Sequence, residues 1–298
     1  MVNSFFQKGT ISEKYSKYFV LTVFCLFWIT YILAKTLDFS NYSQIAIDLL
    51  MHISFVGLLY FMLKKHGKWT LIFAFISFLI ISYSEIQSVW SLNTYDYLNW
   101  PSGTFFWTYP TTIGIGWVYL CYSSYLLTNI LVLQREKKQG FETGDNYLPG
   151  KPLLQKLALI VFLSIIDGLF LFHFGVLNET VGIDLNFWIY YNLHEPTFLG
   201  APTKTLFTYF LASFIFNSCF RLIEYFMNNK GNNQTLSFGK NDIWPLYLFF
   251  LYWFFLIFES IVRFGIDFWT VFVSGPIIII IFSLVISKFY YSRPINEN

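Results

Sequence analysis

Eight long apolar runs divide the chain, and they constrain its fold more than any other feature of the sequence. An α-helix needs about 20 consecutive apolar residues to cross the hydrocarbon core of a bilayer, and each run is close to that length. We therefore predict an all-α protein, a polytopic membrane helix bundle of about eight transmembrane helices. The runs lie near residues 18–36, 44–63, 69–92, 109–133, 153–177, 204–227, 243–262 and 268–288.

The composition supports a membrane location. Hydrophobic residues make up 56% of the 298 residues and charged residues only 12%, whereas a soluble domain carries about 25% charged residues. One water-soluble core cannot hide that much apolar surface, so the bilayer must take it up. The net charge of +2 is too small to indicate nucleic acid as a partner. We expect a multi-pass protein of the cell membrane, surrounded by membrane lipids.

The basic residues predict the orientation. Of the 19 lysines and arginines, 15 lie in or next to the N-terminus, the second, fourth and sixth loops, and the C-terminus. Only Lys35, Lys204 and Arg263 fall on the other side, and Arg221 lies within a run. Because short cytoplasmic loops carry the excess of Lys and Arg, both termini are predicted to be cytoplasmic.

The domain organisation is expected to be simple. The longest cytoplasmic loop, 134–152, separates two four-helix halves, but it need not be a domain boundary, and we treat 1–298 as a single transmembrane domain. The two halves share a weak sequence similarity. Glu85 is followed by an aromatic loop and Pro110, and Asp167 is followed by an aromatic loop and Pro202. Proline suits the start of any helix, so this similarity could come from an internal repeat or from coincidence.

Nine ionisable residues within or next to these runs are candidates for a structural or functional role. A charge in hydrocarbon costs on the order of 3 kcal/mol or more, so such residues usually face a cavity or a partner. Three pairs have helical spacing: Asp48 with His52 predicts a hydrogen-bonded pair or a proton relay, and the other two predict ion pairs within one helix. The nine are Asp48, His52, Glu85, Asp167, His173, Arg221, Glu224, Glu259 and Arg263.

Glu85 and Asp167 stand apart because neither has an oppositely charged residue within one helical turn. A carboxyl without such a partner in apolar surroundings favours its uncharged form, which is a Brønsted acid at neutral pH. Both are therefore candidate catalytic residues. The alternative is that they hold helices together by hydrogen bonds.

Other catalytic motifs are missing from the sequence. It contains no HExxH, GxSxG, DDxxD or Walker A pattern. Cys25, Cys121 and Cys219 fall inside apolar runs, which is typical of packed thiols and not of a disulfide framework or a zinc site. We expect no metal and no cofactor.

The units of acid, aromatic loop and proline resemble the membrane carotenoid biosynthesis proteins that include bisanhydrobacterioruberin hydratase and gamma-carotene hydratase. In that family an acidic helix precedes paired tyrosines, then Gly-x-Pro, then Trp seven residues after the proline. The first unit here has Glu85, Tyr95, Tyr97, Pro110 and Trp117 in that order. The second unit has Asp167 and Trp188 before the stretch 200–209. The resemblance covers about 75–225.

The match departs from the family pattern at several positions. Thr108 replaces the first glycine, and Thr205, Leu206 and Tyr209 replace the Asn, Phe and Trp of the second unit. The proline that usually follows the second acid is also missing. These departures leave the substrate and the reaction open.

The resemblance implies a hydratase-type lyase that adds water to a terminal double bond of a lipophilic isoprenoid or polyene. Glu85 or Asp167 would protonate the alkene to give a tertiary carbocation, and the other acid would orient water. Aromatic faces stabilise such a cation. The residues implied to line the polyene site are Tyr95, Tyr97, Trp117, Trp188 and Tyr209.

Three alternatives use the same residues. A cation-initiated cyclase or isomerase would differ only in how the cation is quenched. A proton-coupled transporter would use Asp48, His52, Glu85 and Asp167 as a relay, but it predicts helices broken in mid-membrane, and only Pro276 lies there. In a non-catalytic membrane subunit the acids would only join helices.

Overall fold

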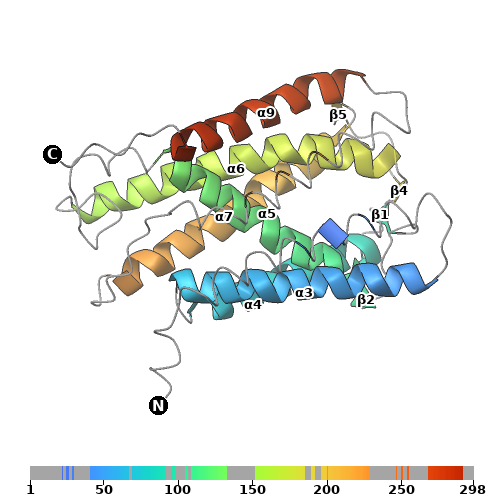
Figure 1. Cartoon of the computed structure of the whole chain (residues 1–298), viewed down its shortest axis with the longest axis horizontal. Coiled ribbons are helices and arrows are strands. Elements are labelled where there is room, and N and C mark those ends of the chain that lie inside the picture. The colour runs from blue at the N-terminus through green and yellow to red at the C-terminus, as the bar shows by residue number, and fades with distance from the viewer. Residues whose placement is uncertain are drawn as a thin grey trace, which may run out of the picture. The chain divides into compact units, whose positions relative to one another are not determined.

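The computed structural model describes residues 22, 25–26, 29, 41–66, 69–91, 95–97, 105–106, 109–132, 152–184, 189–191, 196–199, 201–228, 246, 250, 254 and 268–290. Within these ranges the chain is mainly helical (Figure 1). The long helices are α3 (Asn41–His66), α4 (Trp69–Ile86), α5 (Thr111–Leu131), α6 (Leu153–Asp184), α7 (Thr203–Asn228) and α9 (Phe268–Tyr290). A π-helical turn, η1 (Gln87–Ser91), extends α4.

Six of the eight predicted runs coincide with these helices. The other two, 18–36 and 243–262, lie almost entirely outside the described residues. At the few positions described there the backbone is helical. The largest difference in length is at α6, which continues to Asp184, beyond the predicted end at 177.

Short antiparallel strands connect the helices. Two of the three strand pairs are hairpins with two residues between the strands, and each hairpin leads directly into a helix, α5 or α7. The pairs are β1 (Tyr95–Asp96) with β4 (Ile189–Tyr190), β2 (Phe105–Phe106) with β3 (Tyr109–Pro110), and β5 (Thr197–Phe198) with β6 (Ala201–Pro202).

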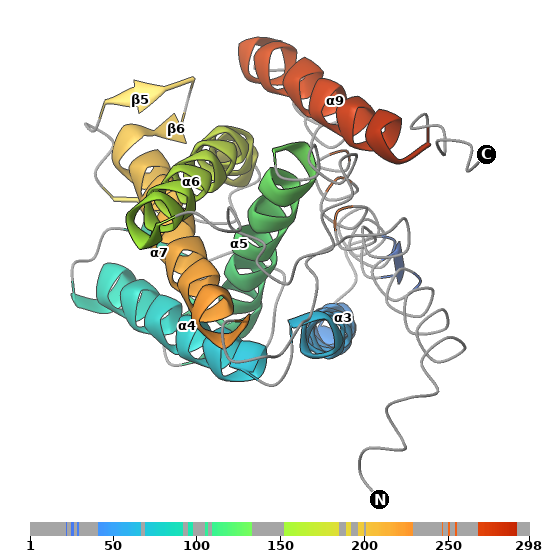
Figure 2. The same cartoon turned by 90° about the vertical axis from the view of Figure 1, so that its left-hand side faces the viewer.

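The chain divides into two compact units. The first unit comprises Met1–Tyr119 and Phe187–Tyr191, and the second comprises Leu120–Asn186 and Asn192–Asn298. The division falls inside α5 and not at the polar loop 134–152. In the first unit α3 packs against α4, and in the second unit α6 packs against α7 and α9 (Figures 1 and 2).

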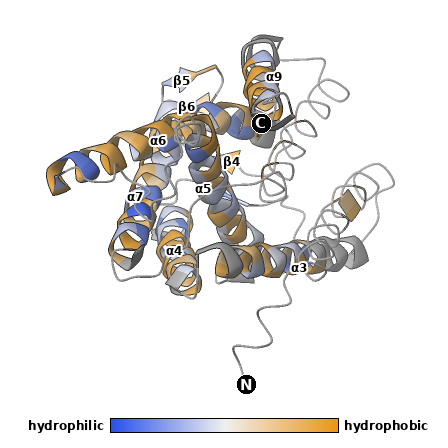
Figure 3. Ribbon diagram, turned by 60° about the vertical axis from the view of Figure 1, so that its left-hand side comes forward, coloured by the Kyte–Doolittle hydropathy of each residue, from blue (hydrophilic) through white to orange (hydrophobic). Residues whose placement is uncertain are grey.

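Side chains on the helices are distributed as in a lipid-facing bundle, with polar groups inside and apolar groups outside. On α6, Ser164 and Asp167 are fully buried, whereas Leu154, Phe162 and Leu169 are more than half exposed. Helix α4 likewise exposes apolar side chains, and both helices are largely hydrophobic along their length (Figure 3). Water would make this arrangement costly, but hydrocarbon favours it.

Three helices in the described part of the chain are long and apolar enough to cross a membrane. Their spanning segments are Phe73–Trp90, Leu153–Thr180 and Thr203–Phe226. This length and composition, together with the outward apolar faces, indicate an α-helical membrane protein.

Helices α6 and α7 approach each other closely at two glycines. A Cβ atom at Gly168 would lie 2.8 Å from the ring of Phe210, and one at Gly175 would lie 2.8 Å from the ring of Tyr209. The glycines are seven residues apart and so lie on one face of α6. Small residues of this kind let membrane helices pack backbone to side chain, and here they fix the position of Tyr209.

Candidate functional site

The carboxyl group of Glu85 lies in the last turn of α4 and accepts three hydrogen bonds. The hydroxyl groups of Tyr95 and Tyr97 donate to Oε2 at 2.6 and 2.8 Å, and Nε1 of Trp117 donates to Oε1 at 3.1 Å. Glu85 is only 7% exposed. All four residues belong to the first unit. The structure thus brings together four of the residues that the sequence singled out.

Strand β1 positions the two phenols. Tyr95 and Tyr97 flank Asp96, and alternate residues of an extended segment point to the same side. The backbone N–H of Tyr97 donates to Asp96 Oδ1 at 2.7 Å, and the Tyr191 hydroxyl donates to Oδ2 at 3.3 Å. Tyr95 also pairs with Tyr190 across the strands, with ring centroids 5.3 Å apart. The aromatic loop therefore holds both hydroxyl groups toward Glu85.

The start of α5 sets the position of the indole. Pro110 ends β3 and fixes the backbone angle just before the helix begins at Thr111. Trp117 follows almost two helical turns later, about 10 Å along the helix axis. Its depth in the bundle is therefore fixed by the hairpin that precedes α5.

Three donors around one buried carboxyl group offset much of the cost of removing it from water. As an anion, Glu85 accepts from both phenols and the indole. When Oε2 carries a proton, a phenol oxygen at hydrogen-bond distance becomes the acceptor, so the proton can be held or passed at this atom. Burial and the negative charge of Glu85 raise the pKa of Tyr97 well above its usual value of 10, so this phenol remains a donor.

Asp48 and His52 are joined by a hydrogen bond to the backbone of Asp48. His52 Nδ1 lies 2.6 Å from the backbone carbonyl oxygen of Asp48, and its Nε2 lies 3.4 Å from Thr111 Oγ1. The imidazole therefore joins α3 to the first residue of α5. The hydrogen bonds of this ring run to a carbonyl and a hydroxyl group.

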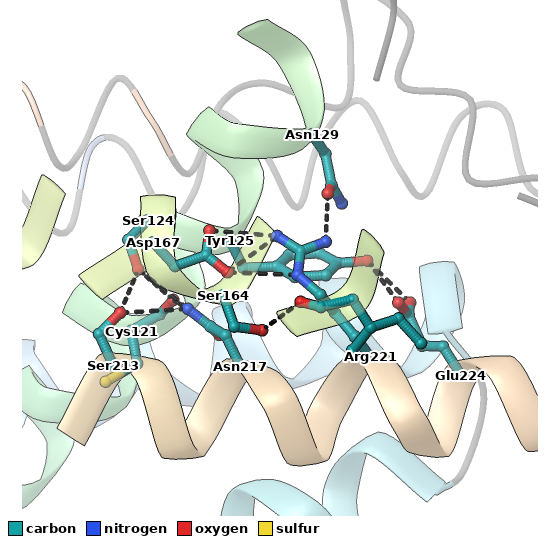
Figure 4. Close-up of polar contacts among 11 residues, drawn as sticks. Cys121, Ser124, Tyr125, Asn129, Ser164, Asp167, Ser213, Asn217, Arg221 and Glu224 are labelled. Atoms are coloured by element: carbon teal, nitrogen blue, oxygen red, sulfur yellow. Dashed lines mark hydrogen bonds and ion pairs between the residues drawn. The ribbon is translucent and has the colours of Figure 1, made fainter. Parts of the chain in front are cut away.

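Asp167 is ion-paired, which corrects the expectation of an acid without a charged partner. Arg221 donates from Nη2 to both carboxylate oxygens, at 3.1 and 2.9 Å, and from Nε to Oδ2 at 3.2 Å. Its Nη1 donates to Oδ1 of Asn129. Both charged side chains are fully buried, and Figure 4 shows the contacts of the pair. The guanidinium group contacts both oxygens of the Asp167 carboxyl group, so this residue is engaged in an ion pair and does not supply a free acid.

Arg221 and Glu224, predicted to pair along one helix, both contact Tyr125. Both oxygens of Glu224 accept from the Tyr125 hydroxyl, at 2.8 and 2.7 Å, and Cζ of Arg221 lies 4.5 Å from the centre of the Tyr125 ring. The resulting network joins α5, α6 and α7 (Figure 4). Such a paired and buried cluster serves to join helices.

Tyr209, predicted to line the same site, lies in the second unit and binds a different acid. Its hydroxyl group donates to Glu179 Oε1 at 3.0 Å and accepts from Asn178 Nδ2 at 2.6 Å. Glu179 is not among the predicted site residues, because the predicted apolar run ends at 177, ahead of the polar residues 178–180. The fifth predicted aromatic residue, Trp188, lies outside the described residues.

Among the described residues, no group of three or more His, Cys, Asp or Glu side chains has a geometry that could hold a metal ion. Comparison of the chain with protein families, curated proteins and solved structures finds no match. The cluster of Glu85, Tyr95, Tyr97 and Trp117, here called the Glu85 site, is the candidate functional site.

Proposed function

We propose that the chain is a membrane-embedded enzyme that adds water across a terminal carbon–carbon double bond of an isoprenoid or polyene, with Glu85 as the proton-transfer residue. The observation that carries the proposal is the buried carboxyl group of Glu85, held by Tyr95, Tyr97 and Trp117 in one cluster. It lies in a segment long and apolar enough to cross a membrane. The resemblance to membrane carotenoid hydratases supports the same reaction.

The reaction needs one carboxyl group. The protonated Glu85 gives its proton to the less substituted carbon of the double bond. The π electron pair forms the new C–H bond, and the more substituted carbon is left as a tertiary carbocation. A water oxygen then forms a bond to the cationic carbon. The oxonium ion returns a proton to the Glu85 carboxylate. The net change is alkene plus water to tertiary alcohol, and Glu85 is again protonated.

The neighbouring aromatic residues would assist at two points. Tyr95 and Tyr97 donate to the oxygen that loses the proton, so they stabilise the carboxylate while the carbocation exists. The aromatic rings offer negatively polarised faces to the cation. The proposed reaction uses one acid and not two, because Arg221 is ion-paired with Asp167.

The segregation of basic residues leads us to propose about eight transmembrane helices with both termini in the cytoplasm. On this topology α4 runs outward, and Glu85 lies in the non-cytoplasmic half of the membrane. Alkaline phosphatase fused at residue 145 should be inactive, and the same reporter fused at residue 101 should be active. The opposite pattern would overturn the orientation.

The experiment that tests the function compares isoprenoids from cells with and without the chain by mass spectrometry. The expected result is a new product heavier by one water, which is lost in E85Q and kept in Y83F, a variant at an exposed position of the same helix. A product of unchanged mass that still requires Glu85 would indicate a cyclase or isomerase. Identical isoprenoids in all cells would contradict the enzymatic proposal.

A further inference from the structure

The connection from α6 to α7 repeats the connection from α4 to α5. In both, a hairpin pairs two residues with two residues across a two-residue loop, and its second strand ends in proline. Phe105 pairs with Pro110 in the first hairpin, and Thr197 pairs with Pro202 in the second. The residue after each proline is a threonine that begins the next helix.

The same helices carry a carboxyl group and an aromatic donor at matching positions. Trp117 lies seven residues after Pro110 and donates to Glu85 at 3.1 Å. Tyr209 lies seven residues after Pro202 and donates to Glu179 at 3.0 Å. The acid precedes its aromatic partner by 32 residues in the first case and by 30 in the second. The strand register and the hydrogen bond are separate observations, and they agree.

This match identifies Glu179, and not Asp167, as the counterpart of Glu85. Asp167 lies three helical turns earlier on α6 and is held by Arg221. Glu224 also accepts from a tyrosine, Tyr125, but that donor lies on α5, more than four turns after the hairpin. Among the described acids, only Glu85 and Glu179 accept a hydrogen bond from the aromatic residue seven positions after the hairpin proline.

The second cluster has the chemistry of a proton-transfer site. Glu179 and Tyr209 are each 4% exposed. Asn178 Nδ2 donates to the Tyr209 oxygen at 2.6 Å, and the Tyr209 hydroxyl donates onward to Glu179. Hydrogen bonds in such a chain polarise one another, so Asn178 makes the phenol a stronger donor.

We infer that Glu179, Tyr209 and Asn178 form a second proton-transfer site of the same class as the Glu85 site, one in each of two tandem repeats. Its ligand would be of the same class, an unsaturated hydrocarbon chain, and this part of the inference rests on the proposed function. The repeat unit runs from the acid-bearing helix through the proline hairpin to the next helix. On this inference, the weak sequence similarity of the two halves reflects a structural repeat.

Labelling with dicyclohexylcarbodiimide tests the site without any substrate, because this apolar reagent modifies membrane carboxyl groups that carry a proton. The full chain in phosphatidylcholine vesicles would be labelled over a range of pH and mapped by peptide mass. We expect Glu85 and Glu179 to be labelled with similar pH dependence, and the ion-paired Asp167 to be labelled about tenfold less. If Glu85 were labelled but Glu179 reacted no faster than Asp167, the second site would be overturned.

Two variants keep the test informative if one fails to fold. In E85Q, labelling of Glu179 should persist. In Y209F, labelling of Glu179 should rise about threefold, because its anion loses a donor, while Glu85 remains unchanged. An equal change at both carboxyl groups, or at neither, would mean that Tyr209 does not act on Glu179 and would overturn the inference.

Squalene in the vesicles tests the ligand class and separates the two proposals. Protection of both carboxyl groups from labelling supports a hydrocarbon ligand at each site. Protection of Glu85 alone overturns the second site and leaves the proposed function standing. If both carboxyl groups are labelled and squalene protects neither, the hydrocarbon ligand and the proposed function are overturned. The inference that Glu179 exchanges a proton would still stand.

Discussion

Arg221 donates to both carboxylate oxygens of Asp167, and neither side chain has any solvent exposure. Such a pair, once formed, is costly to break, because removing one partner leaves the other charge buried. We predict that D167N or R221Q lowers the free energy of unfolding by about 3–5 kcal/mol. Thermal unfolding of the purified chain in detergent would measure the change.

The matched control replaces both charges by apolar side chains of similar size. The double variant D167L/R221M removes the pair without leaving an unpaired charge, so it should be more stable than either single variant. If the losses in free energy of unfolding of the two single variants simply add in the double variant, the two residues do not interact as described.

The phenols beside Glu85 should matter for catalysis more than for folding. Each donates to the oxygen that carries the proton, and a hydrogen bond to a charged group contributes about 1.5–3 kcal/mol. Y95F and Y97F should therefore each lower the yield of hydrated product about 10- to 100-fold. Product yield per amount of chain in the membrane is the measurement, with Y83F as control. An unchanged yield in both variants would exclude the proposed role of the phenols.

The repeat predicts which substitution Trp117 tolerates. Tyr209 occupies the equivalent position in the second repeat and still donates to its acid. W117Y should therefore keep most of the product yield, whereas W117F, which has no donor, should lose about tenfold. Isoprenoid mass spectrometry of the two variants decides this. If W117F performed as well as W117Y, the hydrogen bond to Glu85 would be irrelevant.

Tyr97 should make the stability of the folded protein depend on pH in alkaline solution. Its pKa in the folded chain is raised well above 10 by burial and by Glu85, whereas in the unfolded chain it ionises near 10. Below pH 10 both states keep the proton and stability is unaffected. Above pH 10 only the unfolded state releases it, so stability falls by up to about 1.4 kcal/mol per pH unit.

The variant Y97F isolates this contribution from the other tyrosines. Its free energy of unfolding should fall less steeply above pH 10 than that of the wild type, and the two slopes should agree at pH 8–9. Denaturant titrations at each pH would supply these values. Parallel curves at all pH values would mean that Tyr97 is not buried beside a carboxylate.

The helices and the Glu85 site could be predicted from the sequence because both depend on residues that are close together in the chain. A spanning helix is encoded by a continuous apolar run, so six runs match described helices. The Glu85 site depends on fixed spacings: the tyrosines flank Asp96, and Trp117 follows Pro110 by seven residues. These spacings, read through the family resemblance, pointed to residues that the structure places in contact.

The remaining contacts depend on how helices pack, which spacing along one helix does not reveal. Arg221 lies three residues from Glu224 and 54 from Asp167, yet the buried pair forms with Asp167. Glu179 was overlooked for a related reason. Residues 178–180 are polar and look like the end of a run, but α6 continues to Asp184. Tyr209 of α7 forms hydrogen bonds with Asn178 and Glu179, and the Thr180 hydroxyl donates to the backbone carbonyl groups of Val176 and Leu199.

Proton transfer from Glu85 can be followed by an isotope experiment on the purified chain in vesicles, with the isoprenoid identified from cells as substrate. In D₂O, the expected product of the wild-type chain is a tertiary alcohol with one deuterium on the carbon next to the one that bears the hydroxyl group, and E85Q should form no such product. A product without that deuterium, or one formed equally by E85Q, would contradict proton transfer from Glu85 to the double bond.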